Sequence, residues 1–216
     1  DAFVTDNAII QDHASVSDSA IVRDNARIYN NASVYGNALI QNKTSISGNA
    51  QIYEHAAITG TSQVTDNAQI HGLANLSGNV IITECAKIAG NAHLKENIRV
   101  SEFATICDDV VLSGHVHVSG HAQVRKLTAL EGHETITGSV VITSADEVFC
   151  VKLDTIDNGY GHPTNRYITY TKPNDMWYHH KFYGTSRELL RSAKTNDQRR
   201  FYKQLLKLVG KHPLFL

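Results

Sequence analysis

The sequence predicts an all-β solenoid, a parallel triangular β-helix of about eight 18-residue coils, followed by a small C-terminal α+β cap. Three observations predict this fold. Val, Ile or Leu recurs at every sixth position from Val4 to Ile142, which makes 24 six-residue rungs. The position four residues further on is alanine in most rungs. The period never slips, so we expect a coil without inserted loops.

One rung can be built from the recurring motif Ile/Val-x-Gly/Asp-Asn-Ala-x, as in Val22-Arg-Asp-Asn-Ala and Ile88-Ala-Gly-Asn-Ala. Alternate strand residues share a face, so Ala32 and Val34 should point inward while Ser33 and Tyr35 point outward. The next pair, Gly36-Asn37, should turn a corner, because both residue types tolerate left-handed backbone. Three rungs then close one coil, and each buried aliphatic side chain contributes about 1.5–3 kcal/mol.

This pattern resembles the hexapeptide-repeat, left-handed β-helix superfamily, whose best-known members are acyltransferases. The resemblance covers residues 1–146. It implies a left-handed coil, whereas ordinary parallel crossovers are right-handed. The residue spacing alone does not determine the handedness of the coil, so a right-handed triangular helix stays the alternative.

Residues 147–216 leave the register and predict a separate α+β unit. Strand-like stretches cover Val148–Leu153, Tyr167–Tyr170 and Trp177–Tyr183. Two helix starts follow, a capping box at Thr185-Ser-Arg-Glu188 before Leu189-Leu190, and Thr195-Asn-Asp-Gln198 before an apolar face of Phe201, Leu205, Leu208 and Val209 that ends at Gly210. This order looks like the short terminal unit of phage and prophage hexapeptide-repeat proteins. We expect it to cap the last coil, because an open end exposes unpaired strand groups.

Charge, cysteine spacing and the length of apolar runs limit the class of protein to which this chain can belong. Residues 1–146 hold 8 Lys and Arg against 15 Asp and Glu, about −7, while residues 147–216 hold 12 against 6, about +6. The three cysteines form no CxxC pair, and no apolar run reaches the roughly 18 residues that span a bilayer. We therefore expect a soluble protein in the cytoplasm of a bacterial host, without membrane contact, metal or cofactor. The chain starts at Asp1 inside the repeat, which leaves room for further rungs upstream.

The 18-residue coil places residues in columns on each outer face. One column begins with the apolar residues Phe3, Ile21, Leu39 and Ala57. An exposed apolar stripe predicts a homo-oligomer interface. The alternative is that aliphatic side chains simply suit strands.

A second column brings Tyr35, Tyr53 and His71 together, beside Gln51 and Gln69. Aromatic and amide groups of this kind form recognition patches, so a protein partner is predicted here, with a small ligand or nucleotide as the other option. A cross-strand aromatic ladder without a partner is the alternative.

The histidines raise the question of catalysis. His115 and His133 occupy the same corner of successive coils, and His117 lies two residues along. The resemblance implies a histidine general base, which would make this trio the candidate. Corner positions elsewhere hold Asn, so surface histidines in its place are the simpler interpretation, and the loop-free rungs leave no evident acyl pocket. We therefore predict a non-catalytic binding scaffold, a phage-encoded modulator or inhibitor of a host defence system, with an acyltransferase as the alternative.

Two charged features remain. A basic surface of Arg187, Arg191, Arg199, Arg200 and Lys203 is predicted on the two C-terminal helices, for phosphates or an acidic partner, unless it is only a solvated face. Glu134 is the one charge at an interior rung position before the register ends. A buried unpaired carboxylate is costly, so Glu134 should turn outward or pair with a basic residue of the C-terminal unit.

Overall fold

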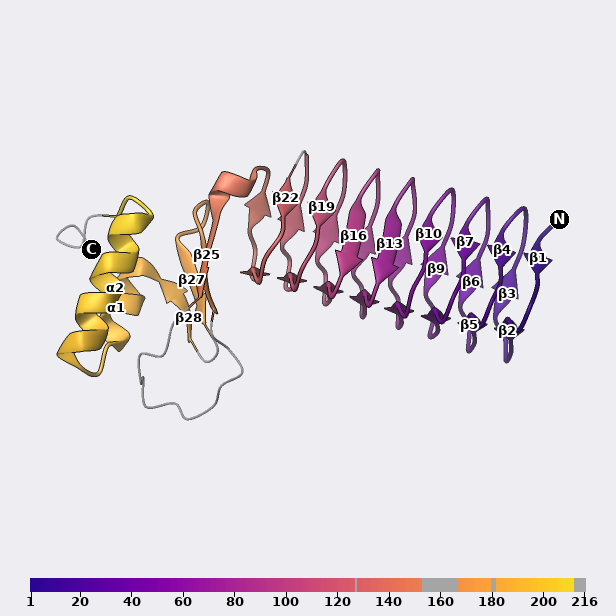
Figure 1. Ribbon diagram of the computed structural model, residues 1–216, viewed down its shortest axis with the longest axis horizontal. Coiled ribbons are helices and arrows are strands. Elements are labelled where there is room, and N and C mark those ends of the chain that lie inside the picture. The colour runs from indigo at the N-terminus through magenta and orange to yellow at the C-terminus, as the bar shows by residue number, and fades with distance from the viewer. Residues whose placement is uncertain (127, 153–166, 180–181, 212–216) are drawn as a thin grey trace. The chain divides into compact units, whose positions relative to one another are not determined.

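The computed structural model describes residues 1–126, 128–152, 167–179 and 182–211. The chain divides into two compact units, Asp1–Ala145 and Asp146–Leu216. The first is a parallel β-solenoid of about eight coils, in which three sheets of eight strands each run along the stack (Figure 1). The predicted fold is therefore confirmed.

Each sheet takes one strand from every coil. The first sheet consists of β1 (Phe3–Val4), β4 (Ile21–Val22), β7 (Leu39–Ile40), β10 (Ala57–Ile58), β13 (Asn75–Gly78), β16 (His93–Glu96), β19 (Val111–Leu112) and β22 (Ala129–Leu130). The second consists of β2 (Ile9–Ile10), β5 (Arg27–Ile28), β8 (Ser45–Ile46), β11 (Gln63–Val64), β14 (Ile81–Ile82), β17 (Arg99–Val100), β20 (His117–Val118) and β23 (Thr135–Ile136). The third consists of β3 (Ser15–Val16), β6 (Ser33–Val34), β9 (Gln51–Ile52), β12 (Gln69–Ile70), β15 (Lys87–Ile88), β18 (Thr105–Ile106), β21 (Gln123–Val124) and β24 (Val141–Ile142).

The register between coils is 18 residues, as in the pair Phe3 and Ile21. Backbone groups of one coil bond to the next, for example the Ile21 N–H to the Ala38 carbonyl at 2.8 Å. Most strands have only two residues, because the chain bends away at a corner on either side. The hand of the coil, which the resemblance predicts to be left, stays a prediction.

The core of the solenoid is the double column of inward residues that the sequence predicts. Ala32 and Val34 are fully buried, whereas Ser33 and Tyr35 are partly exposed. Glu134 departs from this pattern. It is half-buried, and its Oε2 accepts a hydrogen bond from the Gly132 N–H at 3.0 Å. A backbone partner two residues away therefore satisfies part of this carboxylate.

The corners show a rule that the sequence only partly indicated. Left-handed backbone falls on one residue at most corners, and Asp and Glu adopt it as well as Gly and Asn, for example Asp24 at φ 63° and Glu54 at φ 58°. The reason is a hydrogen bond to the next coil. The Asp24 carboxylate accepts from the Asn42 N–H at 2.8 Å, and Glu54 accepts from the Gly72 N–H at 2.7 Å. Each acid therefore satisfies a backbone donor that turns away from the strands.

The second unit contains an antiparallel sheet and two helices. After a 3₁₀ turn at Ala145–Glu147, the strands β25 (Val148–Lys152), β26 (Tyr167–Thr171), β27 (Met176–His179) and β28 (Phe182–Thr185) pair in chain order. The predicted single strand Trp177–Tyr183 is wrong, because the chain reverses there and β27 pairs with β28. Leu153, the predicted end of the first strand, lies outside the described residues. Capping of the last coil by this unit stays a prediction.

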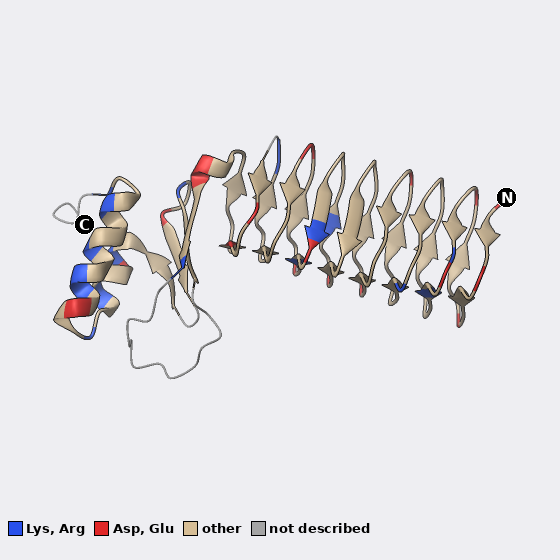
Figure 2. Cartoon of the chain, in the orientation of Figure 1, with Lys and Arg blue, Asp and Glu red and all other residues tan. Residues whose placement is uncertain are grey.

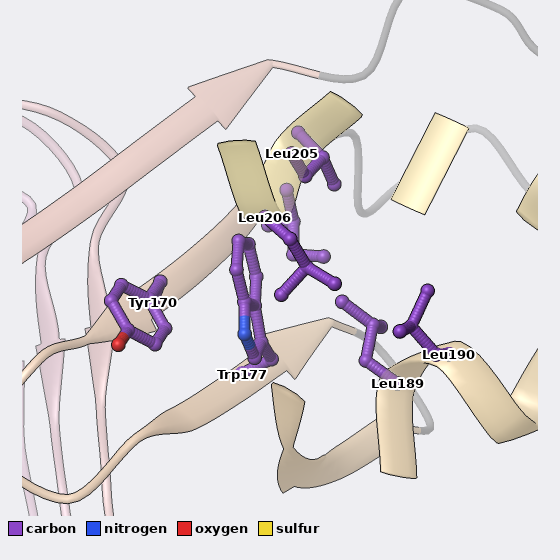
Figure 3. Close-up of a cluster of buried hydrophobic side chains, with 7 residues drawn as sticks. Tyr170, Trp177, Leu189, Leu190, Leu205 and Leu206 are labelled. Atoms are coloured by element: carbon purple, nitrogen blue, oxygen red, sulfur yellow. The ribbon is translucent and has the colours of Figure 1, made fainter. Parts of the chain in front are cut away.

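Both predicted helix starts are confirmed. Thr185 and Glu188 form a capping box before α1 (Ser186–Ser192), and Thr195 caps α2 (Asn196–Leu208). The unit's core gathers side chains from strands and helices around Trp177, as Figure 3 shows, and consists of Ile168, Tyr170, Trp177, Leu189, Leu190, Leu205 and Leu206. The predicted apolar face of α2 needs one correction. Leu208 is 67% exposed, and Leu206 is buried instead, because Leu205 and Leu206 face the cluster while Leu208 faces solvent.

Candidate functional site

Tyr35, Tyr53 and His71 directly follow β6, β9 and β12 of the third sheet and form a continuous stack, which we call the tyrosine ladder. The Tyr35 and Tyr53 ring centroids lie 5.1 Å apart with planes inclined by 3°, and Tyr53 and His71 lie 4.7 Å apart with planes inclined by 8°. The rings stack because their backbones repeat every coil in register. Gln51 and Gln69 are paired in the adjacent strands β9 and β12. The structure therefore brings together all five residues that the sequence singled out.

The ladder has a defined electrostatic environment at its histidine end. Glu54 Oε2 lies 3.6 Å from His71 Nδ1, and the same oxygen accepts the Gly72 N–H. Burial raises the pKa of the Tyr53 phenol, and the neighbouring Tyr35 and Glu54 add to the effect. The raised pKa keeps the Tyr53 hydroxyl protonated to a higher pH than that of a free tyrosine.

The predicted apolar stripe also lies in one line on the first sheet. Phe3, Ile21, Leu39 and Ala57 are direct register neighbours in β1, β4, β7 and β10. Phe3 is 58% exposed and Ile21 38% exposed, while Leu39 and Ala57 are half-buried. The exposed apolar surface is therefore greatest in the first two coils.

The three predicted histidines take part in a ring stack, in a cavity lining, or in both. The His115 and His133 rings stack at a corner, with centroids 4.6 Å apart. His115 and His117 border a cavity of about 280 Å³, which we call the histidine notch, and His133 is not among its lining residues. The notch runs across three successive coils, with Asn79, Asn97 and His115 on the corner side and Ile81, Arg99 and His117 on the strand side.

The notch contains a histidine in an unusual environment. His117 Nε2 is buried, and no described group lies within hydrogen-bonding distance of it. Burial lowers the pKa of the His117 imidazole, and the nearby Arg99 lowers it further, while Glu102 opposes both. The His117 imidazole therefore favours its neutral form.

The sequence prediction missed Asn97 and Arg99 as parts of this site. Each lies one coil before a predicted histidine, Asn97 before His115 and Arg99 before His117. Following both histidine columns back by 18 residues could have found them. Within the described ranges, no group of three or more His, Cys, Asp or Glu side chains could hold a metal ion.

The predicted basic surface lies on the two helices of the second unit. Arg187 and Arg191 are exposed on α1, and Arg199, Arg200 and Lys203 are exposed on α2. Figure 2 shows that basic residues are concentrated on these helices, whereas acidic residues recur at the corners of the solenoid. Binding of phosphates or an acidic partner to this surface stays a prediction.

Neither a protein-family model nor a curated protein sequence matches the chain. The comparison with solved structures gives acyltransferases at low identity, with TM-scores below 0.5. The UDP-N-acetylglucosamine acyltransferase of Campylobacter jejuni is 13% identical over 98% of this chain and 86% of its own, with a TM-score of 0.32. The corresponding enzyme of Francisella novicida is 15% identical over 63% of this chain and 67% of its own, with a TM-score of 0.28. The O-acyltransferase of Moraxella catarrhalis is 15% identical over 99% and 91%, with a TM-score of 0.26.

Among the described residues, no helix is both long and apolar enough to cross a membrane. The repeat, the three parallel sheets and the constant 18-residue register together define the architecture. The chain is a hexapeptide-repeat parallel β-solenoid that carries a small antiparallel sheet with two helices.

Proposed function

We propose that the protein is a non-catalytic binding scaffold, in which the tyrosine ladder anchors a protein partner. The observation that carries this proposal is the stack of Tyr35, Tyr53 and His71, held in register on a continuous sheet. Rigid aromatic side chains lose little conformational entropy on binding, and such residues dominate the energetics of protein interfaces. Gln51 and Gln69 provide amide groups beside the rings.

The order of elements in the second unit resembles that of phage and prophage proteins, which favours a protein of a bacterial host as the partner. Binding would then modulate or inhibit a host process, such as a defence system. Alternatively, the same face binds a small ligand or a nucleotide. Mass spectrometry of material captured from host lysate distinguishes a protein partner from a small molecule.

The decisive experiment compares removal of two ladder rings with removal of one exposed, stacked ring elsewhere on the same solenoid. Tyr35→Ala with Tyr53→Ala removes two outward rings and leaves the buried Val34 and Ile52 in place. Partner affinity should fall by about 1 kcal/mol or more per ring. Phe103→Ala is the matched control, since Phe103 is 57% exposed and stacks on His121 at 4.9 Å, away from the ladder.

Thermal unfolding of each variant checks that the solenoid remains folded. Loss of binding in the double tyrosine variant, with full binding by the Phe103→Ala control, supports the proposal. Equal binding by both variants contradicts it.

We further propose that the apolar stripe joins copies of the chain. Its exposed members, Phe3 and Ile21, lie in neighbouring strands and present a contiguous apolar surface. Introducing Arg at Ile21 and Leu39 should give a smaller particle in light scattering, because two buried charges would oppose the contact. An unchanged mass, or a wild-type protein that is already monomeric, would contradict this interface.

A second candidate function is acyl transfer with a histidine general base. The observation that favours it is the buried Nε2 of His117 beside the notch. Single alanine substitutions at His115, His117 and His133 test it, because loss of an essential base costs about 10²–10⁴-fold in rate. An inactive His117→Ala protein beside a fully active double tyrosine variant would favour the enzyme over the scaffold.

A further inference from the structure

The described lining of the histidine notch contains hydrogen-bond donors but no acidic group. Its polar side chains are Asn79, Asn97, Arg99, His115 and His117, and none of the described lining residues carries a carboxylate. Ile81, Ile98 and Val116 contribute apolar lining. Arginine, imidazole and amide N–H groups around one hollow are hydrogen-bond donors for an anion.

Two of these donors, Asn97 and Arg99, are available to a ligand. Asn79 Nδ2 donates to Asn97 Oδ1 at 3.4 Å, which orients the Asn97 amide N–H₂ onward along the corner. Among the described residues, no carboxylate lies within 4.0 Å of the Arg99 guanidinium, and Arg99 is exposed. The corner acid Glu96 accepts the Gly114 N–H at 3.0 Å. The positive charge of Arg99 is therefore not neutralised by an ion pair within the described part of the chain.

We propose that the histidine notch binds a small organic oxyanion, with its carboxylate or phosphate group on Arg99, Asn97 and His115 and its apolar body on Ile81. The volume of about 280 Å³ suits a compact molecule rather than a long chain. This site does not depend on the tyrosine ladder.

The test is an NMR titration of the full chain, followed through the histidine ring and arginine side-chain signals. Inorganic phosphate and benzoate are the two probes, each compared with sodium chloride at the same ionic strength. A saturable shift at His115, His117 and Arg99 is expected with at least one probe. Saturation by phosphate identifies the phosphate form of the ligand, and saturation by benzoate identifies the carboxylate form.

Arg99→Gln should weaken binding about tenfold or more, because it removes the charged bidentate donor. Arg99→Lys keeps the charge and should bind with intermediate affinity. Arg27→Gln is the matched control, since Arg27 is an exposed residue in the same column of the second sheet, outside the notch. Its affinity should equal that of the wild type.

Shifts that do not saturate, or that equal those in sodium chloride, would overturn the proposal. So would equal losses in Arg99→Gln and Arg27→Gln. The double tyrosine variant should bind the probes normally, so failure of the ladder and failure of the notch give different results.

Discussion

The two units of the chain are stabilised by different kinds of packing contact. In the solenoid, each inward residue meets a similar residue 18 positions away, and the same contact recurs in every coil. In the second unit, one large side chain, Trp177, packs with residues from β26, α1 and α2. Many equivalent contacts therefore share the stabilisation of the solenoid, whereas the stability of the second unit depends on one cluster of side chains.

Polar groups show the same contrast. At the corners of the solenoid, hydrogen bonds such as that from the Asn42 N–H to Asp24 repeat from coil to coil. In the second unit, Asp175 alone accepts the Tyr170 hydroxyl at 3.2 Å and the Ser186 hydroxyl at 2.5 Å, and it lies 3.3 Å from Lys211 Nζ. Loss of one solenoid hydrogen bond should therefore lower the stability of the solenoid only slightly, whereas loss of one residue at this centre should affect the whole second unit.

The largest expected effect is that of Trp177→Ala. Trp177 is fully buried, and its Nε1 donates to the Ser186 hydroxyl at 3.0 Å. Truncation should cost about 3–5 kcal/mol and unfold the second unit, while amide exchange in the solenoid stays slow. Tyr183→Ala is the control, because Tyr183 is 49% exposed in the same sheet. Loss of protection in the solenoid amides would show that the two units are not independent.

An intermediate effect is expected at a corner glycine. Gly48 has φ +69°, and a Cβ there would lie 2.6 Å from the Asp66 backbone nitrogen, so Gly48→Ala combines a left-handed conformation with crowding between coils. Gly210 has φ +74°, and a Cβ added to it would meet no heavy atom within 4 Å. Urea unfolding should show a loss of about 2–3 kcal/mol for Gly48→Ala and about 1 kcal/mol for Gly210→Ala. Equal losses would remove crowding from the explanation.

The smallest effect concerns the corner acids. Asp24→Ala removes the acceptor of the Asn42 N–H and should cost about 1 kcal/mol in the free energy of unfolding. Asp24→Asn keeps an acceptor oxygen and should stay close to the wild type, as Asn42 itself accepts the Gly60 N–H at 3.2 Å. If both variants lose the same amount in urea unfolding, the negative charge rather than the hydrogen bond is responsible.

The sequence predicted the solenoid well because its contacts follow a fixed period. The column of Tyr35, Tyr53 and His71 could be placed from spacing alone, and the structure brings these rings into stacking contact. In the second unit, no period specifies which residues meet. The β27 to β28 reversal and the exposure of Leu208 depend on tertiary packing, and the sequence did not predict them.

The site was only partly predictable for a related reason. Residue type drew attention to His115 and His117, but Arg99 and Asn97 matter through the cavity that they share with these histidines. The buried state of His117 Nε2 depends on its neighbours in the stack, which residue type alone does not specify.

The central claim is that residues 1–145 form one cooperatively stacked solenoid, whose rigid faces hold the ladder and the notch. Hydrogen exchange of the full chain, resolved by residue, tests it most directly. The coils between Val22 and Val124 should exchange slowly and as one block, because their backbone N–H groups bond to the next coil, as in Tyr53 N–H to the Ile70 carbonyl at 3.0 Å. Fast exchange through the middle coils, while the outer ones stay protected, would contradict the account.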